Sequence, residues 1–278
     1  MSRPSDVPPI ADWNRLLDGR VAVVTGGGDG IGGAISTLFA AHGARVEVAE
    51  IDPDRAARVA REGVIRSRVV DVTVDDDVAR LADAVLSEHG RVDVLVNNVG
   101  DYRPLVAFDE STPASWQRMY DINLRHVFAV TRAFLPAMID AHRGSIVNVH
   151  SVEGMRGFPR DPVYGAMKAA VAHFTTCLAV DVGRYGIRVN GIGTDLTQTP
   201  QVDYLTGYED VEELWQSWAP VGRVGWPEDQ ARVALFLASE ASDFVTGHNI
   251  PVDGGTKAGG GWLFSPRAGR FVNRSKYL

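Results

Sequence analysis

The sequence has only one cysteine, Cys177, among 278 residues. A single cysteine excludes a disulfide within the chain and a metal site built from cysteines, which suits a reducing compartment. Long hydrophobic runs are also missing, since no segment approaches the roughly 18 uninterrupted apolar residues of a membrane span. The first 19 residues lack the apolar core of a secretory signal. We therefore expect a cytoplasmic protein.

An excess of positive charge is absent as well. Lysine and arginine number 28 against 35 acidic residues, which gives a net charge of −7. This balance offers no electrostatic basis for binding nucleic acid or an anionic membrane, and we expect neither as a partner. The seven histidines show no metal-ligand spacing, so we expect no metal site.

The sequence does contain a regular alternation of short β-branched runs with longer stretches of helical period. Several of the runs are continuously apolar, as parallel strands covered on both faces are. The alternation predicts an α/β fold, a Rossmann-type doubly wound seven-stranded parallel sheet with helices on both faces. The expected strands are 20–26, 44–51, 65–72, 92–98, 144–151, 187–193 and 249–255, and the expected helices are 30–42, 53–62, 75–89, 113–142, 162–184, 201–219 and 227–239.

These elements predict one domain with two appended ends. The N-terminal tail covers 1–18, the dinucleotide-binding catalytic domain 19–255, and the C-terminal extension 256–278. No repeat, low-complexity linker or break in composition divides the domain further.

The stretch "VVTGGGDGIGGA" lies between the first expected strand and the first expected helix. At this position an open parallel sheet binds a dinucleotide, with the phosphates over the helix N-terminus. The glycines fit two spacings, G-x-G-x-x-G from Gly28 and T-G-x-x-x-G-x-G from Thr25. A Walker loop is excluded because no Gly-Lys-Ser/Thr follows.

Two carboxylates indicate which dinucleotide is bound. Glu50 ends the second expected strand 18 residues after Gly32, close to the ~20 expected of an acid that binds both ribose hydroxyls. A carboxylate there would repel the 2′-phosphate of NADP, and Asp29 inside the glycine turn adds to that repulsion. The expected cofactor is NAD.

The stretch "PVYGAMKAA" places Tyr164 and Lys168 four residues apart in an expected helix. At this spacing the two side chains share a face. The pattern is common, and a tyrosine packed over a lysine stem on the surface is the alternative to a functional pair.

From Thr25 onward the landmarks resemble those of the short-chain dehydrogenase/reductase family in order and spacing, over about 20–255. "TGGGDGIG" resembles the family's glycine turn, "NNVG" its Asn-Asn-Ala-Gly, "YGAMK" its Tyr-x-x-x-Lys and "FVTGHNIPVDGG" its closing strand. Val99 and Met167 depart slightly from the family pattern. Thr194-Asp195 replaces the usual Pro-Gly beside the nicotinamide. The family pattern therefore does not predict the backbone path or the pocket wall at this position.

The resemblance implies a catalytic tetrad of Asn123, Ser151, Tyr164 and Lys168. Ser151 would hold the substrate oxygen, Tyr164 would exchange its proton, and Lys168, with the positive nicotinamide, would lower the pKa of Tyr164 and bind the ribose. Asn123 would bend its helix around a water. The cofactor-binding residues that the resemblance implies are Gly26, Asp29, Gly30, Ile31, Gly32, Glu50, Asp71, Val72, Asn98, Gly100, Tyr164, Lys168 and Thr199.

The segment at about 194–220 is the expected substrate loop, and its aromatic residues favour a cyclic, aromatic or terpenoid secondary alcohol or its ketone. The residues expected to line the pocket are His150, Glu153, Met155, Phe158, Asp195, Tyr204 and Trp215. Alternatives within the class are a cis-dihydrodiol dehydrogenase and a 3-oxoacyl reductase. An inactive NAD(H)-binding scaffold or sensor is the alternative of another class, and the intact tetrad argues against it.

The extension after 255 carries four aromatic residues, Trp262, Phe264, Phe271 and Tyr277. Exposed aromatics would be an apolar liability unless they dock. The resemblance implies a homotetramer, and we expect the extension to cross a subunit interface and pack beside a partner's substrate loop. Docking on its own subunit is the alternative.

Overall fold

The computed structural model describes residues 10, 12–157, 161–202, 218–261, 263–265 and 267–272. These residues form a seven-stranded sheet in the order β3-β2-β1-β4-β5-β6-β7. All neighbouring strands run parallel. The strands are β1 (Val21–Thr25), β2 (Arg45–Glu50), β3 (Ile65–Val69), β4 (Val94–Asn97), β5 (Gly144–Ser151), β6 (Ile187–Thr194) and β7 (Asn249–Val252). The expected fold class is confirmed.

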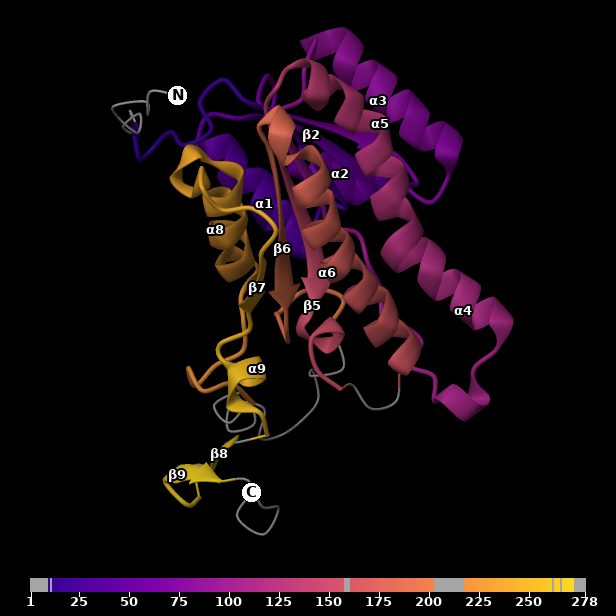
Figure 1. Ribbon diagram of the computed structural model, residues 1–278, viewed down its shortest axis with the longest axis vertical. Helices are drawn as coiled ribbons and strands as arrows, with labels where there is room; N and C mark the ends of the chain where they lie inside the picture. Colours follow the sequence, from indigo (N-terminus) through magenta and orange to yellow (C-terminus); the bar gives the residue numbers. More distant parts are fainter. Residues whose placement is uncertain are drawn as a thin grey trace.

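Helices cover both faces of the sheet, with α1 and α8 on one side and α3, α5 and α6 on the other (Figure 1). The α-helices are α1 (Gly30–Ala41), α2 (Pro53–Val59), α3 (Asp75–His89), α4 (Pro113–Tyr120), α5 (His126–Asp140), α6 (Pro162–Val182), α8 (Pro227–Ala238) and α9 (Thr256–Gly259). Short 3₁₀ turns are η1 (Phe108–Glu110), η3 (Val152–Gly154), η4 (Gly183–Tyr185) and η6 (Glu240–Ser242), and η2 (Asp121–Arg125) is a π-helical turn.

The alternation of side chains along each strand divides the core in two. Val24 of β1 belongs to the core layer under α1 and α8, together with Ile35 and Phe39. Val23, one residue earlier, belongs to the layer under α3, α5 and α6, together with Phe134. Because both faces of β1 are covered, this strand is apolar from Val21 to Val24, as the sequence pattern indicated.

Among the described helices, the run Pro162–Tyr185 is long and apolar enough to cross a membrane by length and composition. It packs against β5 and β6, and it buries Gly165, Lys168 and Val171 on its inner face. It is therefore a core helix of the sheet-covering layer.

Some expected elements differ in their bounds from the structure. The expected helix 113–142 is divided by η2, because the side chain of Asn123 bonds the backbone there instead of leaving a regular α-helical ladder. The last strand ends at Val252, before Gly254 and Gly255 with φ of 63° and 96°. The expected helix 201–219 lies largely outside the described residues.

The C-terminal extension contains a small antiparallel hairpin that the sequence analysis did not anticipate. It consists of β8 (Leu263–Ser265) and β9 (Arg270–Val272). Figure 1 shows the hairpin beyond α9, apart from the main sheet. The division of the chain into tail, domain and extension stays a prediction.

Candidate active site

The glycine turn between β1 and α1 has the backbone geometry that a phosphate-binding turn requires. Gly26 and Gly30 have positive φ angles of 60° and 53°, which glycine adopts without strain. A Cβ on Gly32 would lie 2.1 Å from the carbonyl oxygen of Gly26, so only glycine lets α1 approach the turn this closely. Asn98, after β4, holds the turn by donating from Nδ2 to the carbonyls of Thr25 and Gly26 at 3.0 and 3.2 Å.

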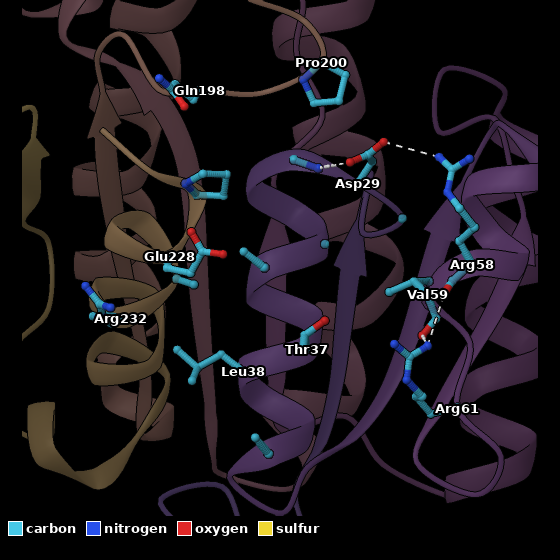
Figure 2. Close-up of a pocket in the computed structure, with 17 residues that line it drawn as sticks. Asp29, Thr37, Leu38, Arg58, Val59, Arg61, Gln198, Pro200, Glu228 and Arg232 are labelled. Atoms are coloured by element: carbon cyan, nitrogen blue, oxygen red, sulfur yellow. Dashed lines mark hydrogen bonds and ion pairs between the residues drawn. The ribbon is translucent and has the colours of Figure 1, made fainter. Parts of the chain in front are cut away.

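Two acids lie at this turn. Glu50, buried at the end of β2, accepts from the backbone N–H of Gly28 at 3.1 Å and of Asp52 at 3.2 Å. Asp29 caps α1, with Oδ1 accepting from Gly30 N at 2.7 Å (Figure 2). A Cβ on Gly28 would lie 2.8 Å from Glu50 Oε2. The backbone thus comes close to the acid that is expected to bind the ribose, and these residues fit a dinucleotide.

The other expected cofactor residues lie along the carboxyl ends of the strands. Asp71, after β3, accepts from Thr73 N and Oγ1 at 2.9 and 2.7 Å. Val72 is buried in the core. Thr199 lies over the glycine turn, because a Cβ on Gly30 would meet its Cγ2 at 3.3 Å. Ile31 packs partly buried against the α1 core layer.

Asn123 occupies the middle of the π-helical turn and is fully buried. Its Nδ2 donates to the carbonyl of Asp101 at 2.8 Å and to that of Met119 at 3.2 Å. Its Oδ1 accepts from Asp101 N at 3.1 Å. The amide therefore anchors the loop after β4, and π-helical turns of this kind are frequent at functional sites.

Ser151, Tyr164 and Lys168 come together at the ends of β5 and α6. Ser151 Oγ donates to the carbonyl of Thr194 at 3.2 Å and accepts from Glu153 N at 3.1 Å. Lys168 Nζ lies 5.7 Å from the centroid of the Tyr164 ring. A Cβ on Gly100 would lie 2.4 Å from Lys168 Nζ and 3.0 Å from Asn123 Oδ1. The Tyr164 side chain also forms a hydrogen bond with that of Ser151, so all four expected tetrad residues belong to one cluster.

The pKa values in this cluster are set mainly by burial. Burial lowers the pKa of Lys168 to about 8, against a smaller opposing effect of the Asp101 carboxylate. Burial raises the pKa of the Tyr164 phenol, the hydrogen bond with Ser151 lowers it, and the carboxylates of Glu153, Asp101 and Asp161 raise it further. In the protein alone, desolvation and these carboxylates outweigh the hydrogen bond with Ser151. The expected lowering of the Tyr164 pKa includes the charge of a bound nicotinamide, and it stays a prediction.

The residues expected to line the pocket do not all lie in one place: some are buried, some form ion pairs, and some lie outside the described residues. His150 is 1% exposed and lies beneath α6, where a Cβ on Gly193 would lie 3.1 Å both from its Cε1 and from Met155 Sδ. Burial lowers the pKa of His150 to about 4. Phe158, Tyr204 and Trp215 lie outside the described residues.

Glu153 and Asp195 are joined by Arg156, which the sequence analysis missed. Arg156 Nη2 donates to Glu153 Oε1 at 2.7 Å and to Asp195 Oδ2 at 3.2 Å. Asp195 Oδ2 also accepts from Thr256 Oγ1, which ties the start of the C-terminal extension to this network. Of these contacts, only the one between Glu153 and Arg156 has the short i,i+3 spacing that sequence reading can find.

Two further residues were missed in the loop after β4. The Tyr102 ring meets the Tyr164 ring edge to face at a centroid distance of 6.4 Å, and its hydroxyl donates to the carbonyl of Gln201 at 3.2 Å. Asp101 contacts Asn123 through its backbone and acts electrostatically on Lys168 and Tyr164. Both residues directly follow the "NNVG" motif in the sequence, and this position could have indicated that they lie at the site.

Comparison with known proteins agrees with this geometry. Residues 26–257 match a family model described as enoyl-(acyl carrier protein) reductase. The chain is 37% identical to a 3-oxoacyl-(acyl-carrier-protein) reductase of Chlamydia muridarum, over 87% of this chain and 99% of the relative. It is 40% identical to cis-4-hydroxycyclohexanecarboxylate dehydrogenase of Sinomonas cyclohexanicum, over 86% of this chain and 97% of the relative.

A solved structure of 7α-hydroxysteroid dehydrogenase, in complex with NADH and 7-oxo glycochenodeoxycholic acid, superposes with a TM-score of 0.82. It shares 34% identity with this chain over 88% of this chain and 98% of the other. Fold, cluster and relatives agree, and the chain belongs to the short-chain dehydrogenase/reductase family as an oxidoreductase acting on alcohols and ketones.

Proposed function

We propose that this enzyme interconverts a cyclic, aromatic or terpenoid secondary alcohol and its ketone, with NAD as the hydride acceptor. The observation that carries the proposal is that Ser151, Tyr164 and Lys168 lie together in a fold that also has a glycine turn. Glu50 accepts a hydrogen bond from this turn. Gly26, Gly30 and Gly32 would hold the pyrophosphate at the N-terminus of α1.

The residues of the cluster divide the chemistry among them. The dinucleotide, when bound, supplies the acceptor for the hydride of the carbinol carbon. Ser151 Oγ would orient the substrate oxygen. The Tyr164 phenolate would take the alcohol proton during oxidation and become the phenol, and the phenol would give that proton to the carbonyl oxygen during reduction. Its pKa is raised by burial in the protein alone. Positive charge near the ring is therefore needed to favour the phenolate. Lys168 supplies one such charge from the chain itself, and the oxidised nicotinamide would supply another.

Glu50 supports NAD over NADP. Its carboxylate is fixed by two backbone N–H groups at the end of β2, where the adenosine ribose is expected. A 2′-phosphate would meet this fixed negative charge, which disfavours it. The NADH in the 7α-hydroxysteroid dehydrogenase structure supports the same assignment.

The names of two relatives support a cyclic substrate, since both act on hydroxyl groups carried by rings. A 3-oxoacyl thioester is the second candidate, because another relative is named for that reaction. Such reductases typically use NADPH, and the Glu50 carboxylate would repel its 2′-phosphate, which makes this candidate the weaker one.

The test is a steady-state panel read from nicotinamide absorbance. Cyclohexanols, a monoterpenoid alcohol and an aryl secondary alcohol are each oxidised with NAD or NADP. An acetoacetyl thioester is reduced with NADH or NADPH. We expect the highest kcat/KM with a ring-bearing alcohol and NAD. A preference for the thioester with NADPH would replace this proposal with the reductase reading, and no turnover of any substrate would favour a binding protein.

A further inference from the structure

The face of the sheet under α6 holds a buried imidazole that the proposed function does not use. It belongs to His150, the residue of β5 directly before Ser151. Two glycines of β6 make room for the ring, because a Cβ on Gly191 would lie 3.0 Å from Nε2 and one on Gly193 would lie 3.1 Å from Cε1. The helix α6, which carries Tyr164, packs over β5 and β6 (Figure 1). The ring thus lies between the strand that carries Ser151 and the helix that carries the phenol.

The two nitrogens of this ring face two oxygen atoms. Nδ1 lies 3.1 Å from the carbonyl oxygen of Ser151. Nε2 and the Oδ1 of Asn249 both border Gly191, since an added Cβ there would lie 3.0 Å from Nε2 and 2.2 Å from Oδ1. The Asn249 amide is fixed in this orientation, because its Nδ2 donates to the carbonyl of Ala172 in α6 at 2.9 Å. Both oxygens therefore only accept hydrogen bonds.

The ring has one proton for these two acceptors. Burial lowers the pKa of His150 to about 4, although the contacts with Ser151 and Asn249 favour the charged ring. At neutral pH the imidazole is therefore uncharged and has a single N–H. The distance from Nδ1 to the Ser151 carbonyl places the proton there, and it leaves Nε2 and Asn249 Oδ1 buried without a hydrogen-bond partner. Since an unpaired buried polar group destabilises the fold, the ring gives up one favourable contact to make the other.

The contact that the ring does make lies at the expected catalytic serine. Two side chains hold the two peptide units that flank Ser151. Thr194 Oγ1 donates to the His150 carbonyl before it at 3.1 Å, and the imidazole donates to the carbonyl of Ser151 itself. The orientation of these two peptide units sets the direction in which the Ser151 side chain leaves the strand. Its hydroxyl then lies between the carbonyl of Thr194 and the N–H of Glu153.

We propose that His150 is a positioning residue, which holds the Ser151 backbone through Nδ1–H and so aims the hydroxyl at the reacting oxygen. The inference rests on the proposed function, because it requires Ser151 to orient the substrate oxygen. Small displacements of a positioning group are costly to the rate even where the fold is kept. The alternative is that the ring only fills the space between α6 and the two glycines.

Two amide substitutions separate the two sides of the ring. In His150→Asn the amide ends at the distance of Nδ1, so it can still donate to the Ser151 carbonyl. In His150→Gln the longer side chain carries its amide to the distance of Nε2, where it can donate to Asn249 Oδ1, and the contact with Ser151 is lost. The experiment measures kcat for a ring-bearing alcohol, the Kd of NAD and the Tm of each variant.

We expect activity and stability to separate in these variants. His150→Gln should lower kcat by about tenfold, with the Kd of NAD changed less than about threefold. Its Tm should equal or exceed that of wild type, because a buried acceptor gains a donor. His150→Asn should keep kcat within about threefold of wild type. Its Tm should fall, because the shorter side chain leaves space beside the glycines.

Two comparisons control for the packing of the ring. His150→Ala also leaves space but donates no hydrogen bond, so it should lose kcat where His150→Asn keeps it. This comparison holds whether or not His150→Gln folds. His173→Gln makes the same chemical change at an exposed histidine of α6, and it should alter neither kcat nor Tm.

Ser151→Ala distinguishes a failure of the inference from a failure of the proposed function. If Ser151→Ala loses most of its turnover but the His150 variants keep theirs, or if kcat follows Tm through the series, the inference is overturned and the proposed function stands. If Ser151→Ala turns over the alcohol at the wild-type rate, the role of Ser151 in the proposed function fails, and this inference fails with it.

Discussion

Lys168 Nζ lies 5.7 Å from the centroid of the Tyr164 ring, on the same face of α6. Lys168 is buried, and its ammonium packs closely against Gly100, where an added Cβ would lie 2.4 Å from Nζ. The lysine is therefore an internal cation between the loop after β4 and the phenol.

Lys168→Ala should lower kcat by about a hundredfold and also weaken NAD binding, because we expect this cation to act on the phenol and to bind the ribose. Steady-state kinetics and a direct NAD titration measure the two effects separately. Lys257→Ala, at an exposed position in α9, is the control and should change neither. A loss of rate with unchanged NAD affinity would show that Lys168 does not hold the ribose.

Arg156→Met should move the pH dependence of alcohol oxidation to higher pH, by roughly half a unit to one unit. Arg156 neutralises Glu153, whose carboxylate raises the pKa of Tyr164, so its loss leaves that carboxylate unopposed. The measurement is kcat/KM against pH. Arg156→Lys should restore most of the wild-type profile, whereas a profile that stays in place in Arg156→Met would remove this electrostatic link.

His126 should make the protein less stable in acid. Burial lowers the pKa of His126 to about 3, so the folded protein keeps this ring neutral at pH values where a free imidazole is charged. Unfolding then takes up a proton between pH 6.5 and about 3, and the free energy of unfolding falls as pH falls through that window.

The expected loss for one such group is about 1.4 kcal/mol per pH unit. Urea unfolding of wild type and His126→Gln at pH 6 and pH 5 measures it, and the variant should have the shallower dependence by about that amount. Parallel dependences in the two proteins would show that His126 does not set the acid limit.

Truncation after Thr256 tests the extension while keeping the Thr256 contact to Asp195. The hairpin has its own aromatic pair, with the Phe264 and Phe271 centroids 5.6 Å apart, and Phe271 is 46% exposed. We expect truncation to weaken a homotetramer or to raise KM for the alcohol, with NAD binding unchanged. Sedimentation and kinetics identical to those of the full chain would leave the extension with neither role.

The sequence was sufficient to predict most of the fold, because apolar β-branched runs such as 92–98 mark buried parallel strands whatever their neighbours. The family resemblance also predicted a tetrad of four positions, which the fold brings close to one another. The sequence could not reveal the contact of Arg156 with Asp195, 39 residues apart, since that contact depends on how β5 and β6 pair.

Electrostatic surroundings were the hardest to predict. The sequence placed Lys168 one turn from Tyr164, but it gave no measure of burial or of the carboxylates that gather around the ring. Likewise, the sequence indicated only a negative charge at Asp29 in the glycine turn, whereas the fold places Arg58 and Arg55 beside it.

The most decisive measurement compares kcat/KM for a ring-bearing secondary alcohol and NAD in wild type and Tyr164→Phe, with the Kd of NAD measured in both. The phenylalanine keeps the ring that packs edge to face on Tyr102 and removes only the hydroxyl. We predict a fall in turnover of about a hundredfold or more, with NAD binding nearly intact. A variant that keeps a rate of about one tenth of wild type would contradict the role of Tyr164 as the acid/base.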